Sequence, residues 1–302
     1  MSRVARDLEL CYRVEGDEDA AAVVLIAGLG QQLNEWPPEL VDGLVGEGFR
    51  VVRFDNRDVG RSSRVPIAPP STLSILLQRG FRPEQYTIGD MALDTVALLD
   101  RLDIDAAHLV GMSMGGMIGQ TIAARHPSRV LTLTSLMSNT GARFGGRPRL
   151  STYLLMYAPP KTDREGFADQ WVAMARHIGS RGFPFDEARV RATALEAFDR
   201  GGGANVEGVS RQLAAIWKTG DRTAELREIR VPTLVVHGDR DPMLAASGGR
   251  ATARAIPGAR LLTIRGMGHD LPVGACPQLV AAIADHARQA RRDARPTVRS
   301  HT

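Results

Sequence analysis

Apolar residues along the chain fall into six short, nearly continuous runs, separated by longer stretches with a helical pattern. The runs are rich in β-branched residues or leucine and read AAVVLIAG, FRVVRFD, AAHLVGM, RVLTLTSLM, TLVVHG and ARLLTIRG. Strands that are buried on both faces of a parallel sheet have this composition. A further segment near the N-terminus, LELCYRVEG, alternates apolar and polar residues and predicts an antiparallel strand at the sheet edge.

Amphipathic stretches between these runs predict helices. Within residues 88–104, one helical face carries Met91, Thr95, Leu98, Leu99 and Leu102, whereas Asp90, Asp94 and Asp103 lie elsewhere. A second helix is expected from Gly115 to His126, because Pro127 cannot continue it. Alternating strands and helices with right-handed crossovers predict an α/β fold, with a mostly parallel central sheet flanked by helices.

The alternation stops between about residues 139 and 230. This stretch has helical patterns and the loop sequences GARFGGRPR, YAPPK and RGGGAN, but no run typical of a buried strand. We therefore expect one α/β core made of residues 1–138 and 230–290, interrupted by a helical insert of residues 139–229. Residues 291–302 are expected to form a basic, flexible tail.

The composition of the 302-residue chain is that of a globular protein, with 43% hydrophobic and 24% charged residues. No apolar run approaches the roughly 20 residues that a membrane-spanning helix needs. The N-terminal sequence lacks the apolar stretch of a secretory signal, so we expect a cytoplasmic protein with no membrane partner. Cys11 and Cys276 have no metal-ligand spacing, and a reducing compartment gives them no need of a disulfide.

The net charge of +4 raises the question of nucleic-acid binding. The arginines are scattered along the chain, and their densest group, RQARRDARPTVRS, follows the last apolar periodicity. A basic arm could contact phosphates, but basic C-terminal tails are commonly just solvated. We expect no nucleic-acid partner, and the sequence does not give the oligomeric state.

The sequence GMSMG places Ser113 in a G-x-S-x-G pattern between a predicted strand and a predicted helix. A serine on such a sharp turn projects its hydroxyl above the sheet edge, and the residues two before and two after must be small, as Gly111 and Gly115 are. The pattern alone is common and also fits a structural serine in a glycine-rich turn. The strand before it and the helix after it favour a nucleophile.

A serine hydroxyl is a weak nucleophile without a base, and residues further along the chain can supply one. Asp239 and Asp241 follow the run TLVVHG, at the carboxyl edge of the sheet where ligands of α/β folds bind. His269 follows the run ARLLTIRG in a glycine-flanked loop. We predict that His269 takes the proton from Ser113 and that Asp241, or alternatively Asp239, orients its imidazole. His237 ends its strand and is expected to be packed at the sheet edge.

An oxyanion formed by attack of Ser113 needs hydrogen-bond donors. The Met114 amide, at the start of the predicted helix, is one candidate. The second is the Leu29 amide in the loop IAGLGQQ, where Gly28 and Gly30 permit a tight turn. The alternative for this loop, a dinucleotide-binding G-x-G-x-x-G, is incomplete because Leu33 occupies the third glycine position.

The motifs AGLGQQ, FDNRDVGRSS, GMSMGG, HGDRDP and GMGH, in this order, resemble those of the α/β-hydrolase superfamily, over roughly residues 7–288. Within it, DNRDVGRS, GMSMGGMIGQ and GMGHDLP are similar to aclacinomycin methylesterase-like enzymes. GMSMGGMIGQ with ARHPSRV is also similar to enol-lactonases that open small lactones. The resemblance implies the α/β-hydrolase fold with no cofactor and no metal.

The resemblance also implies roles for individual residues. It matches Ser113 to the nucleophile, Asp241 rather than Asp239 to the acid, His269 to the base, and Leu29 and Met114 to the oxyanion-hole amides. It matches Asp55, Arg57 and Gly60 to a structural turn rather than to catalysis. The chain departs from the family at Ala27-Gly28, where many members have His-Gly; this alters a loop-supporting hydrogen bond and leaves the donor amide in place.

By the same resemblance, the insert is a helical cap over the site. Six of its apolar side chains could line an acyl or alcohol pocket or could pack the cap onto the core: Met156, Tyr157, Phe167, Trp171, Met174 and Trp217.

The expected function is hydrolysis of carboxylic esters, with an apolar methyl ester or lactone as the small-molecule substrate and an acyl-enzyme on Ser113. Carbon–carbon bond hydrolysis and cofactor-free perhydrolysis use the same three residues and remain alternatives. A hydrolase-like protein that binds a small molecule without turning it over is an alternative of another class.

Overall fold

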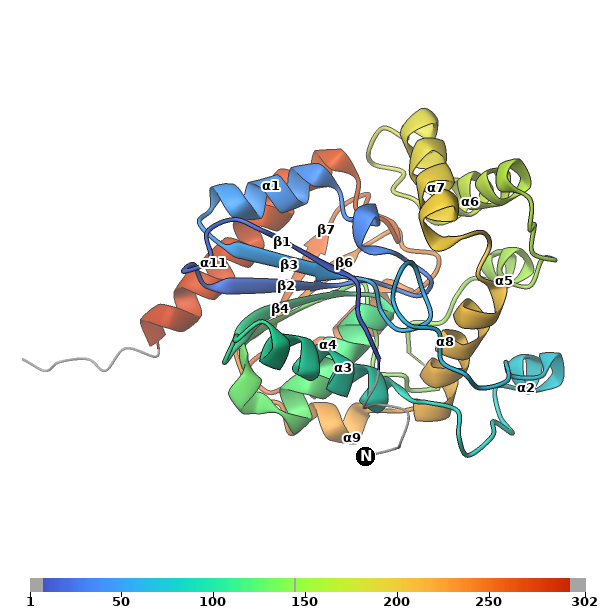
Figure 1. Cartoon of the computed structure of the whole chain (residues 1–302). Helices are drawn as coiled ribbons and strands as arrows, with labels where there is room; N and C mark the ends of the chain where they lie inside the picture. The colour runs from blue at the N-terminus through green and yellow to red at the C-terminus, as the bar shows by residue number, and fades with distance from the viewer. Residues whose placement is uncertain (1–7, 144, 294–302) are drawn as a thin grey trace, which may run out of the picture.

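A seven-stranded sheet forms the centre of the molecule, with the strand order β1-β3-β2-β4-β5-β6-β7 (Figure 1). The computed structural model describes residues 8–143 and 145–293. The strands are β1 Tyr12–Glu15, β2 Ala22–Ile26, β3 Arg50–Phe54, β4 Ala107–Met112, β5 Val130–Leu136, β6 Thr233–Gly238 and β7 Arg260–Ile264. β1 runs antiparallel to β3, and all other neighbouring strands are parallel. The predicted α/β fold with a mostly parallel sheet is confirmed.

Each predicted apolar run contains one parallel strand, and the alternating segment near the N-terminus contains β1 at the sheet edge. Every residue of β2 and of β4 is buried, as expected for strands covered on both faces. The expectation of burial is wrong for β7, in which only Ile264 is buried. β7 lies at the other edge of the sheet and has a strand on one side only, so most of its side chains reach solvent.

Helices cover both faces of the sheet. They are α1 Pro38–Gly46, α3 Ile88–Arg101, α4 Met114–Arg125, α10 Ala246–Ala255 and α11 Cys276–Asp293, whereas the short helix α2 Thr72–Leu77 has no buried residue and lies away from the sheet. Val23 and Leu25 of β2 pack in one apolar cluster with α1 and α11, whereas Val24 and Ile26 pack in another with α3 and α4. Successive strand residues thus face opposite layers, which Figure 1 shows on the two sides of the sheet. Each such buried side chain stabilises the fold by about 1.5–3 kcal/mol.

One charged side chain of α3 is not where the helical pattern predicts it. Asp94 is buried, and its carboxylate accepts two hydrogen bonds from the Arg57 guanidinium, at 2.5 Å and 2.6 Å. The Arg57 side chain in turn lies over the ring of Tyr86. The expectation that Asp94 lies away from the buried face is therefore wrong, because a partner 37 residues earlier in the chain neutralises it.

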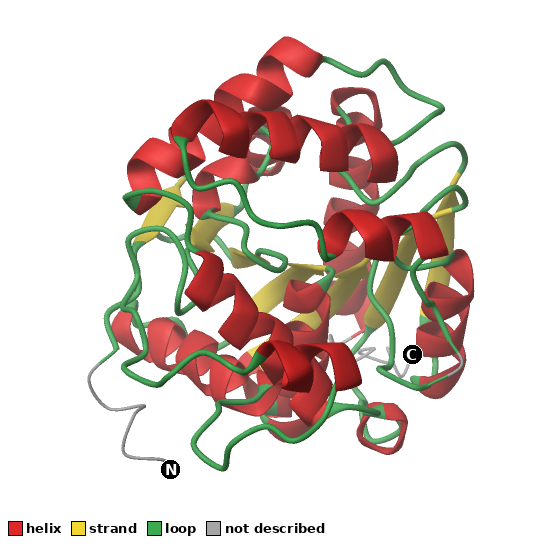
Figure 2. Cartoon of the chain, turned by 90° about the vertical axis from the view of Figure 1, so that its right-hand side faces the viewer, coloured by secondary structure: helices red, strands yellow, loops and turns green. Residues whose placement is uncertain are grey.

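Between β5 and β6 the chain forms five helices: α5 Leu150–Met156, α6 Arg164–Ile178, α7 Glu187–Gly201, α8 Val206–Thr219 and α9 Thr223–Leu226. Among the described residues of this interval there is no strand. Figure 1 shows α5–α8 gathered at one end of the sheet, and from that side helices and loops lie in front of the strands (Figure 2). These five helices are consistent with the predicted division into a core and a helical insert, which stays a prediction.

The C-terminal helix α11 extends to Asp293, so residues 291–293 of the predicted tail continue a helix rich in alanine and arginine. The rest of the predicted tail lies outside the described residues. None of the helices in the described part of the chain has both the length and the hydrophobicity that crossing a bilayer requires.

Candidate active site

Ser113 lies on the turn between β4 and α4 in an unusual backbone conformation. Its φ is +54° and its ψ is −115°, a region that residues other than glycine rarely adopt. Its amide donates a hydrogen bond to the Leu136 carbonyl at the end of β5, at 2.9 Å. The turn is therefore held by the neighbouring strand, and Ser113 stands at the carboxyl end of the sheet.

Close backbone contacts explain the glycines around Ser113. A Cβ at Gly111 would clash with the Gly115 backbone, and a Cβ at Gly115 would clash with the Ile26 carbonyl of β2. The sequence pattern indicated both positions. A third, Gly116, was not recognised; a Cβ there would lie 2.6 Å from the Ser138 Cβ. Together these glycines allow α4 to start directly against β2 and β5.

The structure brings Ser113, His269 and Asp241 together from three separate loops. Ser113 Oγ lies 3.0 Å from His269 Nε2, and His269 Nδ1 lies 2.7 Å from Asp241 Oδ2. Both Asp241 and His269 are buried. The arrangement matches a hydroxyl, a base and an orienting carboxylate in hydrogen-bonding sequence.

The Asp241 carboxylate is held ionised by its surroundings. Its Oδ1 accepts hydrogen bonds from the Met243 and Leu244 amides, both at 2.8 Å. Burial by itself raises the pKa of Asp241, but the interactions with His269 and His237 outweigh it and hold the pKa of that carboxyl well below its usual range. An ionised Asp241 favours the His269 tautomer in which Nδ1 carries the proton and Nε2 accepts the proton of Ser113.

The second candidate acid, Asp239, does not contact His269. Its Oδ1 accepts a hydrogen bond from the Gly266 amide at 2.6 Å, so it fastens the loop before His269. His237 was expected to be packed at the sheet edge, and it is buried there. Its Nε2 lies 2.7 Å from the Leu244 carbonyl and 3.4 Å from Asp241 Oδ2. Sequence reasoning did not recognise this contact with Asp241.

The two predicted oxyanion donors flank Ser113. Met114 is the first residue of α4, so its amide is one of those for which the helix has no carbonyl partner. The loop that carries Leu29 is close as well, since a Cβ at Gly28 would lie 3.4 Å from the Ser113 Cβ. Within the described residues, the Leu29 amide has no hydrogen-bond partner. Two candidate donor amides thus lie on the two segments next to Ser113, the loop after β2 and the start of α4, and their role in an oxyanion hole stays a prediction.

Glu35, on the same loop, was not recognised from the sequence. Its Oε1 accepts a hydrogen bond from the Gln32 amide at 2.7 Å. Desolvation of the carboxyl, with a smaller contribution from Asp55, raises the pKa of Glu35 to about 8. Glu35 is therefore protonated at neutral pH, beside the loop that presents the Leu29 amide.

The insert contacts the loop that carries His269. The His269 amide donates to the Ile178 carbonyl at 2.7 Å, and the Gly268 amide donates to Ser180 Oγ at 2.8 Å. The Ser180 hydroxyl in turn donates to the carboxylate of Asp270, whose pKa is raised by burial. The last residue of α6 and the segment after it thus hold the His269 loop from the insert side, through contacts that no local sequence pattern indicates.

The predicted pocket residues of the insert are partly accounted for by packing. The Trp171 ring lies 5.6 Å from that of Phe167, which lies 5.4 Å from Phe198 on α7. Tyr157 is exposed and stacks on Tyr153. Met156, Met174 and Trp217 are half-buried. A role of these side chains in lining a substrate pocket stays a prediction.

The residues matched to a structural turn form a buried network. Asp55 accepts hydrogen bonds from the Leu33 amide at 2.8 Å and the Arg61 amide at 2.9 Å, and it pairs with Arg200 of α7 at 2.6 Å. A Cβ at Gly60 would clash with the Asp55 carboxylate. Asp58 lies in the same turn, and the sequence pattern did not mark it as part of this network.

Asp58 is buried and has several partners of its own. It pairs with Arg211 of α8 through both carboxylate oxygens, at 2.8 Å and 3.0 Å, and accepts from the Tyr86 hydroxyl at 2.9 Å. These ion pairs join α7 and α8 of the insert to the loops of the core.

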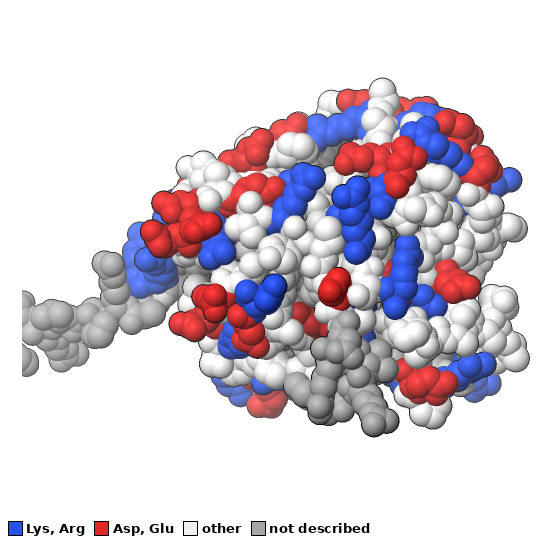
Figure 3. Space-filling view, viewed as in Figure 1, with Lys and Arg blue, Asp and Glu red and all other residues white. Residues whose placement is uncertain are grey.

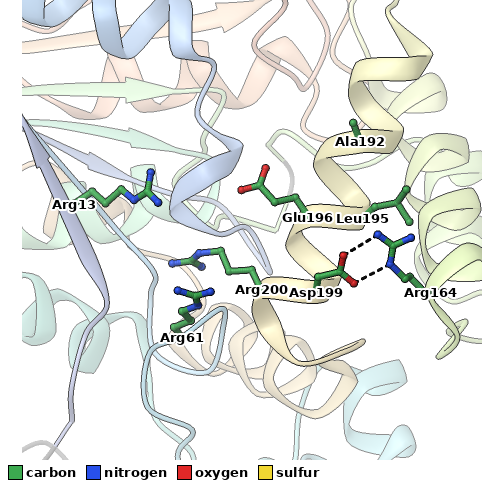
Figure 4. A pocket seen from close by; sticks show the side chains of 8 residues that line it. All are labelled: Arg13, Arg61, Arg164, Ala192, Leu195, Glu196, Asp199 and Arg200. Carbon is green, nitrogen blue, oxygen red and sulfur yellow. Dashed lines mark hydrogen bonds and ion pairs between the residues drawn. The ribbon is translucent and has the colours of Figure 1, made fainter.

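A separate cleft of about 590 Å³ lies between α7 and the edge of the core (Figure 4). Its lining includes Arg13, Arg61, Arg164, Arg200, Glu196 and Asp199, and none of the three residues Ser113, Asp241 and His269. Arg164 pairs with Asp199 at 2.7 Å, so part of the positive charge is neutralised. On the face shown in Figure 3, acidic and basic side chains are interspersed.

Comparison with known proteins agrees with the fold described above. Residues 21–273 match the family described as alpha/beta hydrolase fold. The rhodomycin D methylesterase DnrP of Streptomyces peucetius is 32% identical over 295 residues, which cover 91% of this chain and 93% of that protein. The 3-oxoadipate enol-lactonase 2 of Acinetobacter baylyi is 26% identical over 258 residues, which cover 82% of this chain and 81% of that protein.

Solved structures are similar over nearly the whole chain. The enol-lactonase from Burkholderia xenovorans LB400 has a TM-score of 0.65 and 25% identity, and the match covers 94% of this chain and 97% of that chain. The meta-cleavage product hydrolase CumD from Pseudomonas fluorescens IP01 has a TM-score of 0.71, and the match covers 94% of this chain and 95% of that chain. The hydrolase CumD is 19% identical to this chain, so the similarity supports the fold alone.

Proposed function

Because the chain belongs to the α/β-hydrolase fold family, we propose that it hydrolyses carboxylic esters through an acyl-enzyme on Ser113. Relatives that match 91% of the chain at 32–33% identity are methylesterases, which supports a carboxylic ester hydrolase. The observation that carries the mechanism is the continuous hydrogen-bonding sequence from Ser113 Oγ through His269 to Asp241.

In the first half of the reaction, Ser113 Oγ attacks the ester carbonyl carbon while His269 Nε2 takes its proton. The carbonyl oxygen gains negative charge and is stabilised by the Leu29 and Met114 amides. His269 then returns the proton to the departing alkoxy oxygen, and the alcohol leaves. Asp241 stabilises the imidazolium during both transfers.

In the second half, a water molecule loses its proton to His269 and attacks the acyl carbon. The bond to Ser113 Oγ breaks, Oγ regains the proton, and the carboxylic acid leaves. With a lactone, the alkoxy group is tethered to the acyl group, so the product is one hydroxy acid instead of an acid and an alcohol.

We propose an apolar small molecule as the substrate, either a methyl ester or a lactone. The names of the methylesterase and enol-lactonase relatives support these two leaving-group classes. The packed aromatic side chains Phe167, Trp171 and Phe198 of the insert provide apolar surface for such a substrate.

A direct test is hydrolysis of p-nitrophenyl esters over a range of acyl lengths, together with methanol release from apolar methyl esters. We expect turnover by the wild type and a loss on the order of 10⁴-fold or more in kcat for Ser113→Ala. Hydrolysis that survives in Ser113→Ala contradicts the proposal. A folded wild type that turns over no ester also contradicts it.

A further inference from the structure

Two glutamine side chains hold the amides on either side of Leu29. The Gly28 amide donates to Gln31 Oε1 at 3.0 Å, and the Gly30 amide donates to Gln212 Oε1 at 2.9 Å. The Leu29 amide between them has no partner within the described residues. The loop therefore has its outer amides fixed and its central amide available.

Gln212 is fixed at both ends of its side-chain amide. It is completely buried on α8, and its Nε2 donates to the Arg57 carbonyl at 2.7 Å. Because a carbonyl faces one end and an N–H the other, only one orientation of the amide satisfies both. Arg57 is itself anchored by Asp94, and the neighbouring Arg211 anchors α8 to Asp58. The Gly30 amide is thus attached to a rigid part of the molecule.

Gln31 holds the loop from its own side. Its side chain reaches back three residues to the Gly28 amide and interacts with the enclosed Glu35 carboxyl. Gly28 is the residue whose Cα lies against Ser113, as the 3.4 Å separation between an added Cβ and the Ser113 Cβ indicates. Gln31 therefore fixes the loop at Gly28, next to Ser113, and Gln212 fixes it at Gly30.

We propose that Gln31 and Gln212 are positioning residues that orient the Leu29 amide toward the transition-state oxyanion. This inference rests on the proposed function of Ser113 as nucleophile. It extends that function by assigning part of the oxyanion geometry to a side chain of the insert. A donor acts fully only where its distance and direction fit the oxyanion, so freeing a neighbouring amide weakens it without removing it.

The experiment compares Gln31→Met, Gln212→Met and the double variant with a matched control, Gln120→Met. Gln120 is another completely buried glutamine, on α4, whose partners are Ser135 and Arg222 and not the Leu29 loop. Methionine keeps the length of the side chain and removes its acceptor. Thermal unfolding of all four variants measures the general cost of losing a buried amide.

Two readouts separate positioning from folding. The first is ester turnover, in which we expect kcat to fall about 10- to 100-fold for each glutamine variant with little change in KM. The double variant should lose at most about 10³-fold, the cost of one oxyanion donor, because both glutamines act on the same amide. Gln120→Met should keep its kcat at temperatures where it is folded.

The second readout is the rate at which a fluorophosphonate labels Ser113, which needs the oxyanion hole but no ester substrate. We expect the same order of loss in both glutamine variants and wild-type labelling in Gln120→Met. If the wild type is labelled but turns over no ester, the proposed ester function fails, and the labelling rates still decide the roles of Gln31 and Gln212. Loss of labelling or kcat in Gln31→Met and Gln212→Met no greater than in Gln120→Met overturns this inference. A wild type that is not labelled overturns it together with the role of Ser113.

Discussion

The end of α6 with the segment after it, and helix α8, contact the catalytic loops through polar groups, whereas α5 presents large apolar side chains to solvent. Ile178, Ser180 and Gln212 each bond to a backbone amide of a loop that carries a site residue. Leu150 and Leu154 of α5 are 78% and 72% exposed. The insert therefore has an inner part that bonds to the catalytic loops and an outer part, the solvent-facing side of α5. The opposite side of α5 is held by the core, because Thr152 is buried and its Oγ1 donates to the Pro242 carbonyl at 3.1 Å.

This difference gives two kinds of expected sensitivity. A change in the inner part alters the position of a loop with a proton-transfer or oxyanion role, so it should affect kcat. A change in the outer part leaves those loops in place. The effect on kcat should therefore fall from the site itself, through the inner part, to the exposed side of α5.

The largest effect is expected for Asp241→Asn. An asparagine cannot hold His269 in the tautomer that accepts the proton of Ser113, so kcat should fall by about 10⁴-fold. Asp239→Asn is the matched control, because an asparagine oxygen still accepts from the Gly266 amide. Steady-state kinetics on one ester measures both. Equal losses in the two variants would contradict the assignment of Asp241.

An intermediate effect is expected for Ser180→Ala, in the inner part of the insert. The change leaves the Gly268 amide without its acceptor and the half-buried Asp270 carboxyl without its donor. We expect a destabilisation of about 1–3 kcal/mol and a fall in kcat of about tenfold as the His269 loop loosens. Chemical denaturation and kcat measure the two.

Ser151→Ala, on α5, provides the comparison for Ser180→Ala, since Ser151 is exposed and touches neither catalytic loop. It should change neither quantity beyond error. A kcat for Ser180→Ala equal to that of Ser151→Ala would mean that the insert does not position His269.

An effect on stability and its pH dependence, and not on kcat, is expected for Glu35→Gln. With a folded pKa of about 8 and an ordinary value of 4.5, the folded chain keeps a proton that the unfolded chain loses between these pH values. The stability of the wild type should therefore fall as pH rises from 4.5 to 8, and the glutamine variant escapes this loss. We expect its advantage to grow over this window by about 1.4 kcal/mol for each pH unit between the two pKa values.

Denaturation at several pH values measures this advantage, with Glu39→Gln as the control. The pKa of Glu39 is lowered from 4.5 to about 2 by its hydrogen bond to Arg189, so from roughly one pH unit above 4.5 up to pH 8 this carboxyl is ionised in both folded and unfolded chains. The stability difference between Glu39→Gln and wild type should stay constant there. A constant difference for Glu35→Gln as well would mean that Glu35 is ionised in the folded chain.

The smallest effect is expected for Leu150→Ser and Leu154→Ser in the outer part. Substitution of exposed side chains usually changes stability by less than about 0.5 kcal/mol, and neither leucine contacts a catalytic loop. The kcat for a short acyl ester should stay within about twofold of wild type. A tenfold loss in either variant would place α5 with the inner part and remove the distinction.

The sequence allowed prediction of what depends on near neighbours in the chain. The six apolar runs mark strands because a parallel sheet buries both faces, and GMSMG marks a turn whose glycines meet other backbones. Asp94 was placed wrongly because its charge is neutralised by Arg57, which no helical periodicity reveals.

The contacts of Ser180 and Gln212 stayed unrecognised for the same reason. Each joins residues 88 or more positions apart, and single polar residues on helices or in loops look alike whether or not a distant amide needs them. Local chemistry could thus be predicted, and the support that the insert gives to the site could not.

The bonds that residues 178–182 make with the His269 loop also determine which parts of the insert can be replaced by those of a related protein. The Gly182 amide donates to the Gly266 carbonyl at 2.9 Å, next to the bonds that Ile178 and Ser180 make with the His269 loop. A chimera that replaced residues 139–229 as one block would sever these bonds and the one from Gln212 to the Gly30 amide. The positions that can be exchanged without severing such bonds are therefore those on the solvent-facing side of α5, such as Leu150 and Leu154, with Arg149 and Thr152 kept for their bonds to the Pro242 carbonyl.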